Sequence, residues 1–100
     1  MYAVVREWPF HAARMAEARD RVAAYDARMR EQPGYQGSIL IDLGHGHRVT
    51  VTLWRSAAHA AAARAVLDPT IHRLLDPLLV APSQIVAVGE VVETDVGPVK

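Results

Sequence analysis

The sequence predicts an α+β domain whose elements follow the order β-α-β-β-α-β. Two apolar runs, residues 38–43 and 48–54, flank a Gly-containing turn of about four residues, which is typical of a β-hairpin. Stretches with helical character precede and follow this hairpin, and a β-rich run stands near each end of the chain. An order of this kind is typical of the ferredoxin-like split βαβ arrangement, with one antiparallel sheet and the helices on one face.

Composition limits the classes of function to consider. The 100 residues correspond to a single domain, expected to span residues 1–94, with a flexible tail at 95–100. Eleven basic and eleven acidic side chains give a net charge of +0, whereas a nucleic-acid-binding protein usually carries a basic excess. No apolar run approaches the ~20 residues that span a bilayer, and Glu7 and Pro9 interrupt any signal-peptide pattern. We therefore expect a cytoplasmic protein that binds neither nucleic acid nor membrane.

The chain contains no cysteine, which excludes a disulfide framework, a thiolate nucleophile and a Cys-ligated metal. His45 and His47 form an H-x-H pair in the predicted turn. Because the sequence supplies no third ligand nearby, we interpret them as solvated turn residues and expect no metal there. The sequence also has no Gly-rich phosphate-binding loop, and we expect no cofactor.

The first strand and the first helix are predicted from residue type and spacing. Residues 2–8 are rich in β-forming side chains and are followed by Pro9, which ends the strand. Residues 12–31 form the clearest helix, because apolar side chains recur there at intervals of three and four. These are Met15, Ala18, Val22, Tyr25 and Met29. Pro33 and Gly34 end this helix.

Alternation along the hairpin gives its two strands different faces. Ile39, Ile41 and Leu43 share one face of the first strand, and Val49, Val51 and Leu53 share one face of the second. The opposite face of the second strand is mixed and holds Arg48, Thr50, Thr52 and Trp54. A mixed face that includes a Trp can line a cavity or a subunit interface.

The second helical region is predicted to be broken. Ser56 is the expected N-cap of an Ala-rich helix over residues 57–67. Asp68 and Pro69 have the pattern of an N-cap followed by Pro at the first helical position, which predicts a separate short helix over residues 70–79. Residues 83–93 form the last predicted strand.

If both helices cover one face of the sheet, the other face exposes Ile, Leu and Val side chains. Two such sheets packed face to face would bury them. The sequence therefore predicts a homodimer formed through the sheet face, that is, a dimeric α/β barrel.

Five short stretches carry a resemblance to a known family. They are residues 2–6 (Tyr-Ala-Val-Val-Arg), 32–37 (Gln-Pro-Gly-Tyr-Gln-Gly), 42–46 (Asp-Leu-Gly-His-Gly), 53–56 (Leu-Trp-Arg-Ser) and 89–92 (Gly-Glu-Val-Val). On these the chain resembles, over nearly its whole length, the antibiotic-biosynthesis-monooxygenase-like family of dimeric α+β barrels. The P-G-x-x-G and W-x-S elements have structural roles. The first ends a helix and begins a strand, and the second supplies a buried aromatic residue and a helix N-cap. The resemblance therefore indicates the fold more strongly than the chemistry.

The resemblance implies three functional expectations. One is a cofactor-independent monooxygenase that acts on an aromatic, polyketide or quinol-type small molecule. The second is a non-catalytic dimeric domain that binds small molecules or regulates, which the Ala-rich second helix fits equally well. The third is a haem-degrading enzyme, which is disfavoured because that branch uses an Asn on the first strand and a Trp in the second helix. This chain has no Asn, and Ala62 and Ala63 stand near the expected Trp.

For an oxygenase, His72 is the expected base, because its reference pKa lies near physiological pH. Arg6, Tyr25, Trp54 and Arg73 are the expected substrate-binding residues. A structural interpretation stands beside each role.

His72 can be a half-exposed polar residue of a short helix. Tyr25 and Trp54 can be packing residues, and Arg6 can form a cross-strand pair with Glu90.

Overall fold

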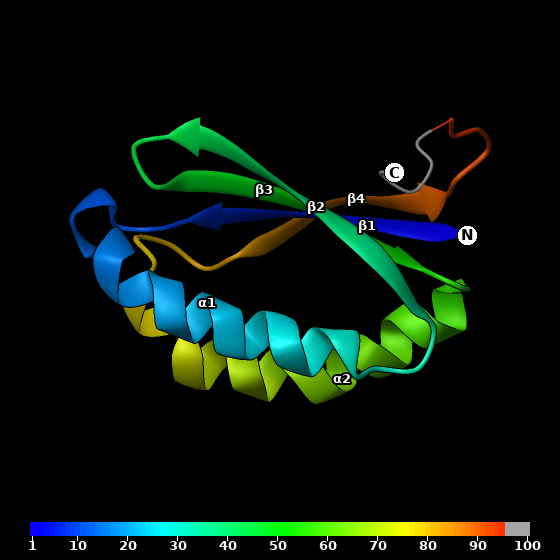
Figure 1. The fold of residues 1–100 in the computed structure, drawn as a ribbon, viewed down its shortest axis with the longest axis horizontal. Helices are drawn as coiled ribbons and strands as arrows, with labels where there is room; N and C mark the ends of the chain where they lie inside the picture. Colours follow the sequence, from blue (N-terminus) through cyan, green and yellow to red (C-terminus); the bar gives the residue numbers. More distant parts are fainter. Residues whose placement is uncertain (96–100) are drawn as a thin grey trace.

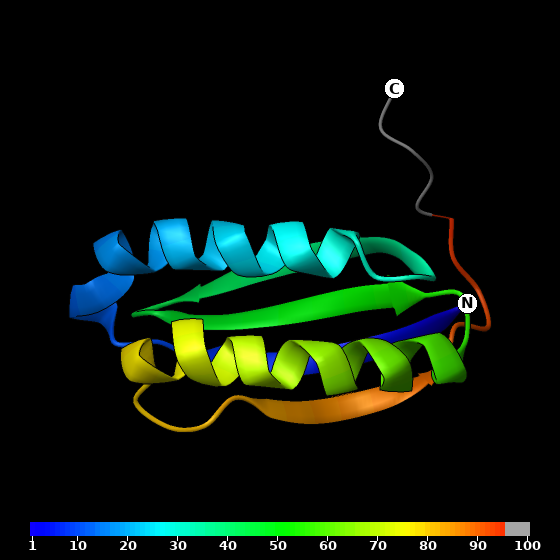
Figure 2. The same cartoon turned by 90° about the horizontal axis from the view of Figure 1, so that it is seen from below.

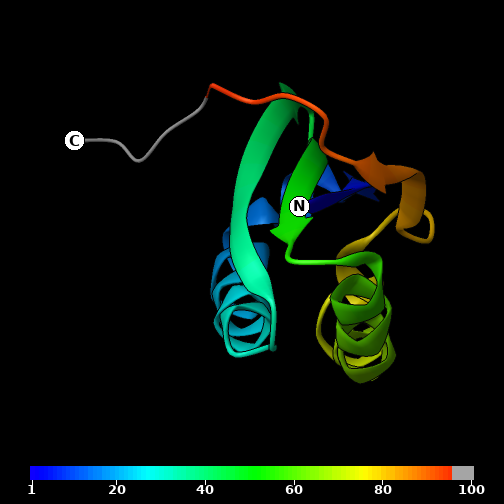
Figure 3. The ribbon, with the colours of Figure 1, turned by 90° about the vertical axis from the view of Figure 1, so that its right-hand side faces the viewer.

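The computed structural model describes residues 1–95 and confirms the predicted α+β, ferredoxin-like architecture (Figure 1). Its elements are β1 (Tyr2–Pro9), the 3-10 turn η1 (Ala12–Arg14), α1 (Met15–Arg30), β2 (Tyr35–Gly44), β3 (His47–Trp54), α2 (Ala57–Leu74), the 3-10 turn η2 (Asp76–Leu78) and β4 (Gln84–Glu90). The strands form one antiparallel sheet in the order β2-β3-β1-β4. Both helices lie side by side on one face of this sheet (Figures 2 and 3). Of the tail expected at residues 95–100, all but Asp95 lies outside the described residues.

The hairpin has longer strands and a shorter turn than predicted. Only His45 and Gly46 separate β2 from β3, and their φ angles of 56° and 84° are both positive. Positive φ at both central residues is the geometry of two-residue hairpin turns, whose twist matches that of the flanking strands. Asp42 Oδ1 accepts a hydrogen bond of 2.8 Å from the Gly44 N–H at the entrance to the turn. The predicted four-residue turn is therefore wrong by two residues.

The second helix is continuous, so the predicted break at Asp68 is wrong. Pro69 lies inside α2 and is exposed to solvent. The buried side chains of α2 continue in phase through this point, and packing against the sheet outweighs the hydrogen bond that the proline cannot donate. They are Ala60, Ala63, Leu67, Thr70 and Ile71. The start of α2 is as predicted, since Ser56 Oγ accepts a hydrogen bond from the His59 N–H.

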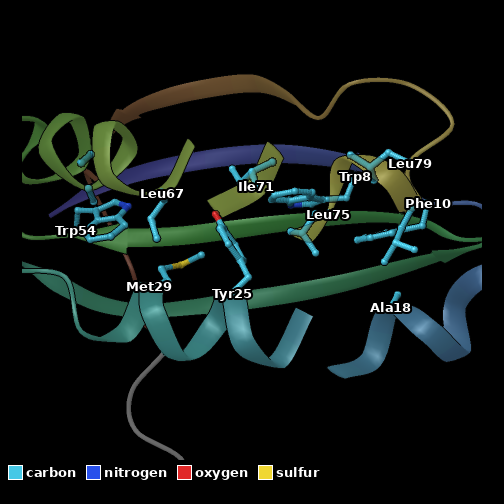
Figure 4. Close-up of a cluster of buried hydrophobic side chains, with 13 residues drawn as sticks. Trp8, Phe10, Ala18, Tyr25, Met29, Trp54, Leu67, Ile71, Leu75 and Leu79 are labelled. Carbon is cyan, nitrogen blue, oxygen red and sulfur yellow. The ribbon is translucent and has the colours of Figure 1, made fainter. Parts of the chain in front are cut away.

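The core fills the space between the sheet and the two helices (Figure 4). Trp8 of β1 and Trp54 of β3 each have 4% of their surface exposed, and Leu75 and Leu78, which follow α2, are almost completely buried. Thr52 and Trp54 are buried in this layer, in agreement with the face predicted for β3. None of the helices among residues 1–95 is long and apolar enough to cross a membrane.

Among residues 1–95, no helix lies over the other face of the sheet. Ile39 and Ile41 of β2 are 47% and 42% exposed, and they pair in register with Val51 and Val49 of β3. The aliphatic face predicted from the hairpin is therefore present and uncovered in the single chain. The homodimer expected from it stays a prediction.

Candidate functional site

A cavity of about 470 Å³ lies between α2 and the strands β1, β3 and β4. Its floor is the helix-covered face of the sheet, and α1 contributes Tyr25 and Met29. Apolar and aromatic side chains provide most of its walls, and a few polar groups point into it. Most of the lining comes from Tyr2, Val4, Arg6, Trp8, Tyr25, Thr50, Thr52, Trp54, Ala57, Ala60, Arg64, Leu67, Asp68, Ile71, Ile85 and Val88. A concave, largely apolar cavity with few polar groups is typical of a small-molecule site.

Two indole rings form rigid parts of the wall. Trp8 donates a hydrogen bond of 3.0 Å from Nε1 to Thr50 Oγ1, and its ring lies 5.6 Å from that of Tyr25 in an edge-on arrangement. Trp54 packs edge-on against Tyr35, with ring centroids 5.8 Å apart. Aromatic rings held in this way offer flat surfaces to another aromatic molecule. Trp54 is thus a buried packing residue that also lines the cavity.

Arg6 brings a positive charge into this cavity. Its side chain is 14% exposed, and its guanidinium carbon lies 5.4 Å from the centroid of the Trp8 ring, within range of a cation–π interaction. Arg6 Nη1 is 3.4 Å from Ser83 Oγ, to which it donates a hydrogen bond. Burial lowers the pKa of Arg6, and the nearby Tyr25 and Asp68 partly offset this. The positive charge of Arg6 is therefore only partly balanced by the charges of the protein groups near it.

The alternative pairing of Arg6 with Glu90 is wrong. Arg6 stands opposite Ile85 in β4, whereas Glu90 stands opposite Tyr2 and lies 3.8 Å from the N-terminal ammonium group. The register of the two strands decides this, because Arg6 is four residues along β1 from Tyr2, the residue opposite Glu90, and the pattern of residue types does not specify that register.

Tyr25 reaches from α1 toward the sheet (Figure 4). The residue is 6% exposed, and its hydroxyl forms no hydrogen bond with any residue in the described part of the chain. Burial raises the pKa of Tyr25 to about 12, although Arg6 acts in the opposite direction. The hydroxyl is therefore neutral at physiological pH and free to donate a hydrogen bond to a bound molecule.

His72 and Arg73 do not line the cavity. Both are exposed, and the His72 side chain is 73% exposed, with Nδ1 hydrogen-bonded to Asp76 Oδ2. This hydrogen bond raises the pKa of His72. Of the five residues predicted for the site, the fold brings Arg6, Tyr25 and Trp54 together and leaves His72 and Arg73 on the surface.

Asp68 and Arg64 line the cavity, although the sequence reasoning assigned them no functional role. Asp68 Oδ1 lies 4.0 Å from Arg6 Nη2, and Asp68 Oδ2 lies 3.7 Å from Arg64 Nε. The contact between Arg64 and Asp68 could have been predicted from the sequence, because residues at i,i+4 in a helix are neighbours on its surface. The contact with Arg6 joins residues 62 positions apart and depends on how α2 lies over β1.

The two histidines of the turn have different surroundings. His45 is exposed, and His47 Nε2 lies 3.0 Å from Glu7 Oε1. Within residues 1–95, no three His, Cys, Asp or Glu side chains are grouped so that they could hold a metal ion.

Comparison with solved structures identifies the fold. A variant of SnoaB, a cofactor-independent oxygenase from Streptomyces nogalater, matches with a TM-score of 0.75 and 21% identity over 93% of this chain and 94% of that one. A protein of unknown function from Nitrosomonas europaea matches with a TM-score of 0.80 and 13% identity over 97% and 94% of the two chains. An antibiotic biosynthesis monooxygenase matches with a TM-score of 0.76 and 13% identity over 93% and 100%.

This chain has the antibiotic biosynthesis monooxygenase fold. The resemblance noted in the sequence is thereby confirmed at the level of architecture. No protein-family model matches the sequence, and no curated protein matches it. Sequence identities this low establish the fold alone, and a shared fold does not identify the substrate that the cavity binds.

Proposed function

We propose that this protein is a cofactor-independent monooxygenase that acts on a hydroxylated aromatic or quinol-type small molecule. The observation that carries the proposal is the convergence of Arg6 and Tyr25 on a cavity walled by Trp8 and Trp54. The indole rings suit a flat aromatic body, and the cation and the neutral hydroxyl suit a phenolate oxygen. The similarity in fold to a cofactor-independent oxygenase supports the same reaction class.

The chemistry follows from stabilisation of the substrate anion. A bound phenol loses its proton, and its phenolate oxygen accepts hydrogen bonds from the Arg6 guanidinium and the Tyr25 hydroxyl. The electron-rich ring then reduces dioxygen and forms a carbon–oxygen bond. For an anthrone, the CH₂ group becomes a carbonyl and the second oxygen atom leaves as water, so that anthrone and O₂ give anthraquinone and H₂O. The apolar walls protect the anion from protonation by solvent.

Asp68 is the carboxylate that we assign as proton acceptor. Its Oδ1 atom is 4.0 Å from Arg6 Nη2, which leaves a gap longer than a hydrogen bond. A substrate hydroxyl in that gap could donate to Asp68 and accept from Arg6 at the same time. His72 was the base expected from the sequence, and its exposed position outside the cavity favours Asp68 instead.

The experiment combines ligand binding with oxygen uptake. Thermal unfolding is measured against an anthrone, a naphthol, a quinol and haem, because a ligand at one hundred times its Kd adds about 2.7 kcal/mol of stability. For a domain of this size, that stabilisation raises the melting temperature by roughly 10–20 °C. Oxygen consumption and product formation are then measured for the native chain and for Arg6→Gln, Asp68→Asn and His72→Ala, with Arg28→Gln, an exposed change of equal charge, as control.

We expect binding and turnover of at least one phenolic compound. Arg6→Gln should lower ligand affinity at least tenfold, and Asp68→Asn should lower the rate more than the affinity. If His72→Ala still turns over substrate, Asp68 is supported as the base. If His72→Ala binds the ligand but no longer turns it over, His72 is the base. Stabilisation without oxygen uptake indicates the non-catalytic binding domain, and stabilisation by haem alone indicates the haem-degrading branch. Either result rejects the proposed reaction.

We also propose that the functional unit is a homodimer packed through the open sheet face. Ile39 and Ile41 are each more than two-fifths exposed in the single chain, and a second copy would cover them. A sedimentation measurement at micromolar concentration tests this, and a monomer contradicts it. Ile41→Glu should convert the dimer to a folded monomer.

A further inference from the structure

Arg48 is a charged side chain in the layer between the sheet and α1 that has no hydrogen-bond or ion-pair partner among residues 1–95. It belongs to β3 and pairs with Trp8 and Asp42 in register, on the same face as Thr50, Thr52 and Trp54. Its Nε atom is buried and has no hydrogen-bond partner, and no described residue forms an ion pair with its guanidinium. A buried polar atom without a partner is uncommon in folded proteins and points to something that occupies the site.

Two hollows meet at Arg48. An outer groove of about 390 Å³ runs along α1, where Met15, Arg19 and Val22 line it. An inner cavity of about 50 Å³ lies under α1 and is lined in part by Phe10, Val22 and Leu40. Val22, Asp26 and Arg48 line both hollows, so Arg48 stands at their junction. The inner cavity is divided from the proposed substrate cavity by Trp8, Tyr25, Met29, Thr50 and Thr52, which line both.

We propose that this junction is a second binding site, which takes a short-chain aliphatic monocarboxylate. The carboxylate lies in the outer groove against the Arg48 guanidinium, whose planar fork matches two carboxylate oxygens. The hydrocarbon chain lies along Met15 and Val22 in the outer groove, and its end enters the inner cavity beside Phe10 and Leu40. An apolar cavity of about 150 Å³ takes up a benzene ring, so an inner cavity of about 50 Å³ has room for the end of a linear chain and excludes a ring.

The charges around the site favour a single negative charge. Arg19 and Arg48 line the outer groove with Asp26, and the formal charges of these three residues sum to +1, whereas Asp42, opposite Arg48 in β2, lines neither hollow. A carboxylate neutralises that charge, whereas a dianion such as phosphate would leave an excess negative charge beside Asp26. The site is separate from the proposed catalytic cavity, and its existence does not depend on the proposed oxygenase activity.

The test follows binding of hexanoate to the native chain by two-dimensional ¹H–¹⁵N NMR, with hexanamide as the uncharged molecule of the same shape. The reporting amides are those of Val22 and Ala23, which line the outer groove but not the catalytic cavity. Arg48→Met removes the charge and keeps a long side chain, Arg48→Lys keeps the charge without the planar fork, and Arg28→Met removes an exposed charge elsewhere on α1. Circular dichroism verifies that each variant is folded.

We expect saturable shifts at Val22 and Ala23 with hexanoate and at least tenfold weaker binding of hexanamide. Arg48→Met should weaken hexanoate binding at least tenfold, Arg48→Lys less, and Arg28→Met less than twofold. The proposal is overturned if hexanoate gives no saturable shift at these amides, which would mean that solvent alone satisfies Arg48. It is also overturned if Arg48→Met binds hexanoate as the native chain does. If Arg48→Met does not fold, the comparison of hexanoate with hexanamide on the native chain decides.

Discussion

At Gly34, a single added methyl group should lower the free energy of unfolding through one contact that the structure identifies. It follows α1, has a φ of +84°, and its carbonyl accepts a hydrogen bond of 2.8 Å from the Arg55 N–H. A Cβ built on Gly34 would lie 2.4 Å from the His59 ring, closer than any real contact. His59 is held by its N–H donating to Ser56 Oγ and by Nδ1, which is 2.7 Å from that oxygen. The ring therefore cannot move without disturbing the N-cap of α2.

The cost of Gly34→Ala has two parts. A non-glycine residue in the left-handed region costs about 1–2 kcal/mol. Displacing His59 and weakening the Ser56 cap costs about 1–2 kcal/mol more. The expected loss in the free energy of unfolding is therefore about 2–4 kcal/mol. Because 1 kcal/mol corresponds to about 4–8 °C in a domain of this size, the melting temperature should fall by roughly 8–32 °C.

Gly44→Ala is the matched control. Gly44 has a similar φ of +90°, but nothing lies within 4 Å of its built Cβ. The backbone penalty and the effect of Ala on the unfolded chain are alike in the two variants, so their difference isolates the contact with His59. Chemical denaturation monitored by tryptophan fluorescence measures both. The double variant Gly34→Ala/His59→Ala should recover at least ~1 kcal/mol relative to Gly34→Ala.

Equal losses for Gly34→Ala and Gly44→Ala, within about 0.5 kcal/mol, would refute this reasoning. A double variant no more stable than Gly34→Ala would refute it as well.

Three further predictions concern α2, the cavity and the exposed histidine. Pro69→Ala should raise the free energy of unfolding by about 1 kcal/mol in denaturant titrations, because it restores a helical N–H at an exposed position of α2. Tyr25→Phe should change stability by less than about 1 kcal/mol, since the hydroxyl has no hydrogen-bond partner among the described residues, yet it should weaken phenolic ligands severalfold in calorimetry. The hydrogen bond to Asp76 raises the pKa of His72, so protonated His72 stabilises the folded chain. This stabilisation is fully present below about pH 6.5, the pKa in the unfolded chain, and is lost as the pH rises through the folded-state pKa. Melting temperatures of His72→Ala should accordingly fall below those of the native chain at pH 5.5 and match them at pH 9.

The contents of the cavity were only partly predictable. The stripe of α1 predicted that Tyr25 points toward the sheet, and alternation along β3 predicted the face of Trp54. Arg6 was a candidate, but its neighbours Ser83 and Asp68 could not be inferred from local patterns. The intrinsic pKa of histidine makes His72 a candidate base, but the exposure of its side chain depends on how far α2 continues beyond Pro69.

The sequence by itself determined the order of the elements, the buried face of α1 and the two faces of the hairpin. These follow from periodicities of 3.6 and 2 residues and from turn residues, which act over a few neighbouring positions. Only the tertiary structure decided that α2 runs through Pro69, because burial of its apolar face outweighs a local helix-breaking preference. It also decided that Arg6 lies close to Asp68 and that Arg48 has no partner within residues 1–95, since both outcomes depend on the docking of helices against strands that are distant in the chain.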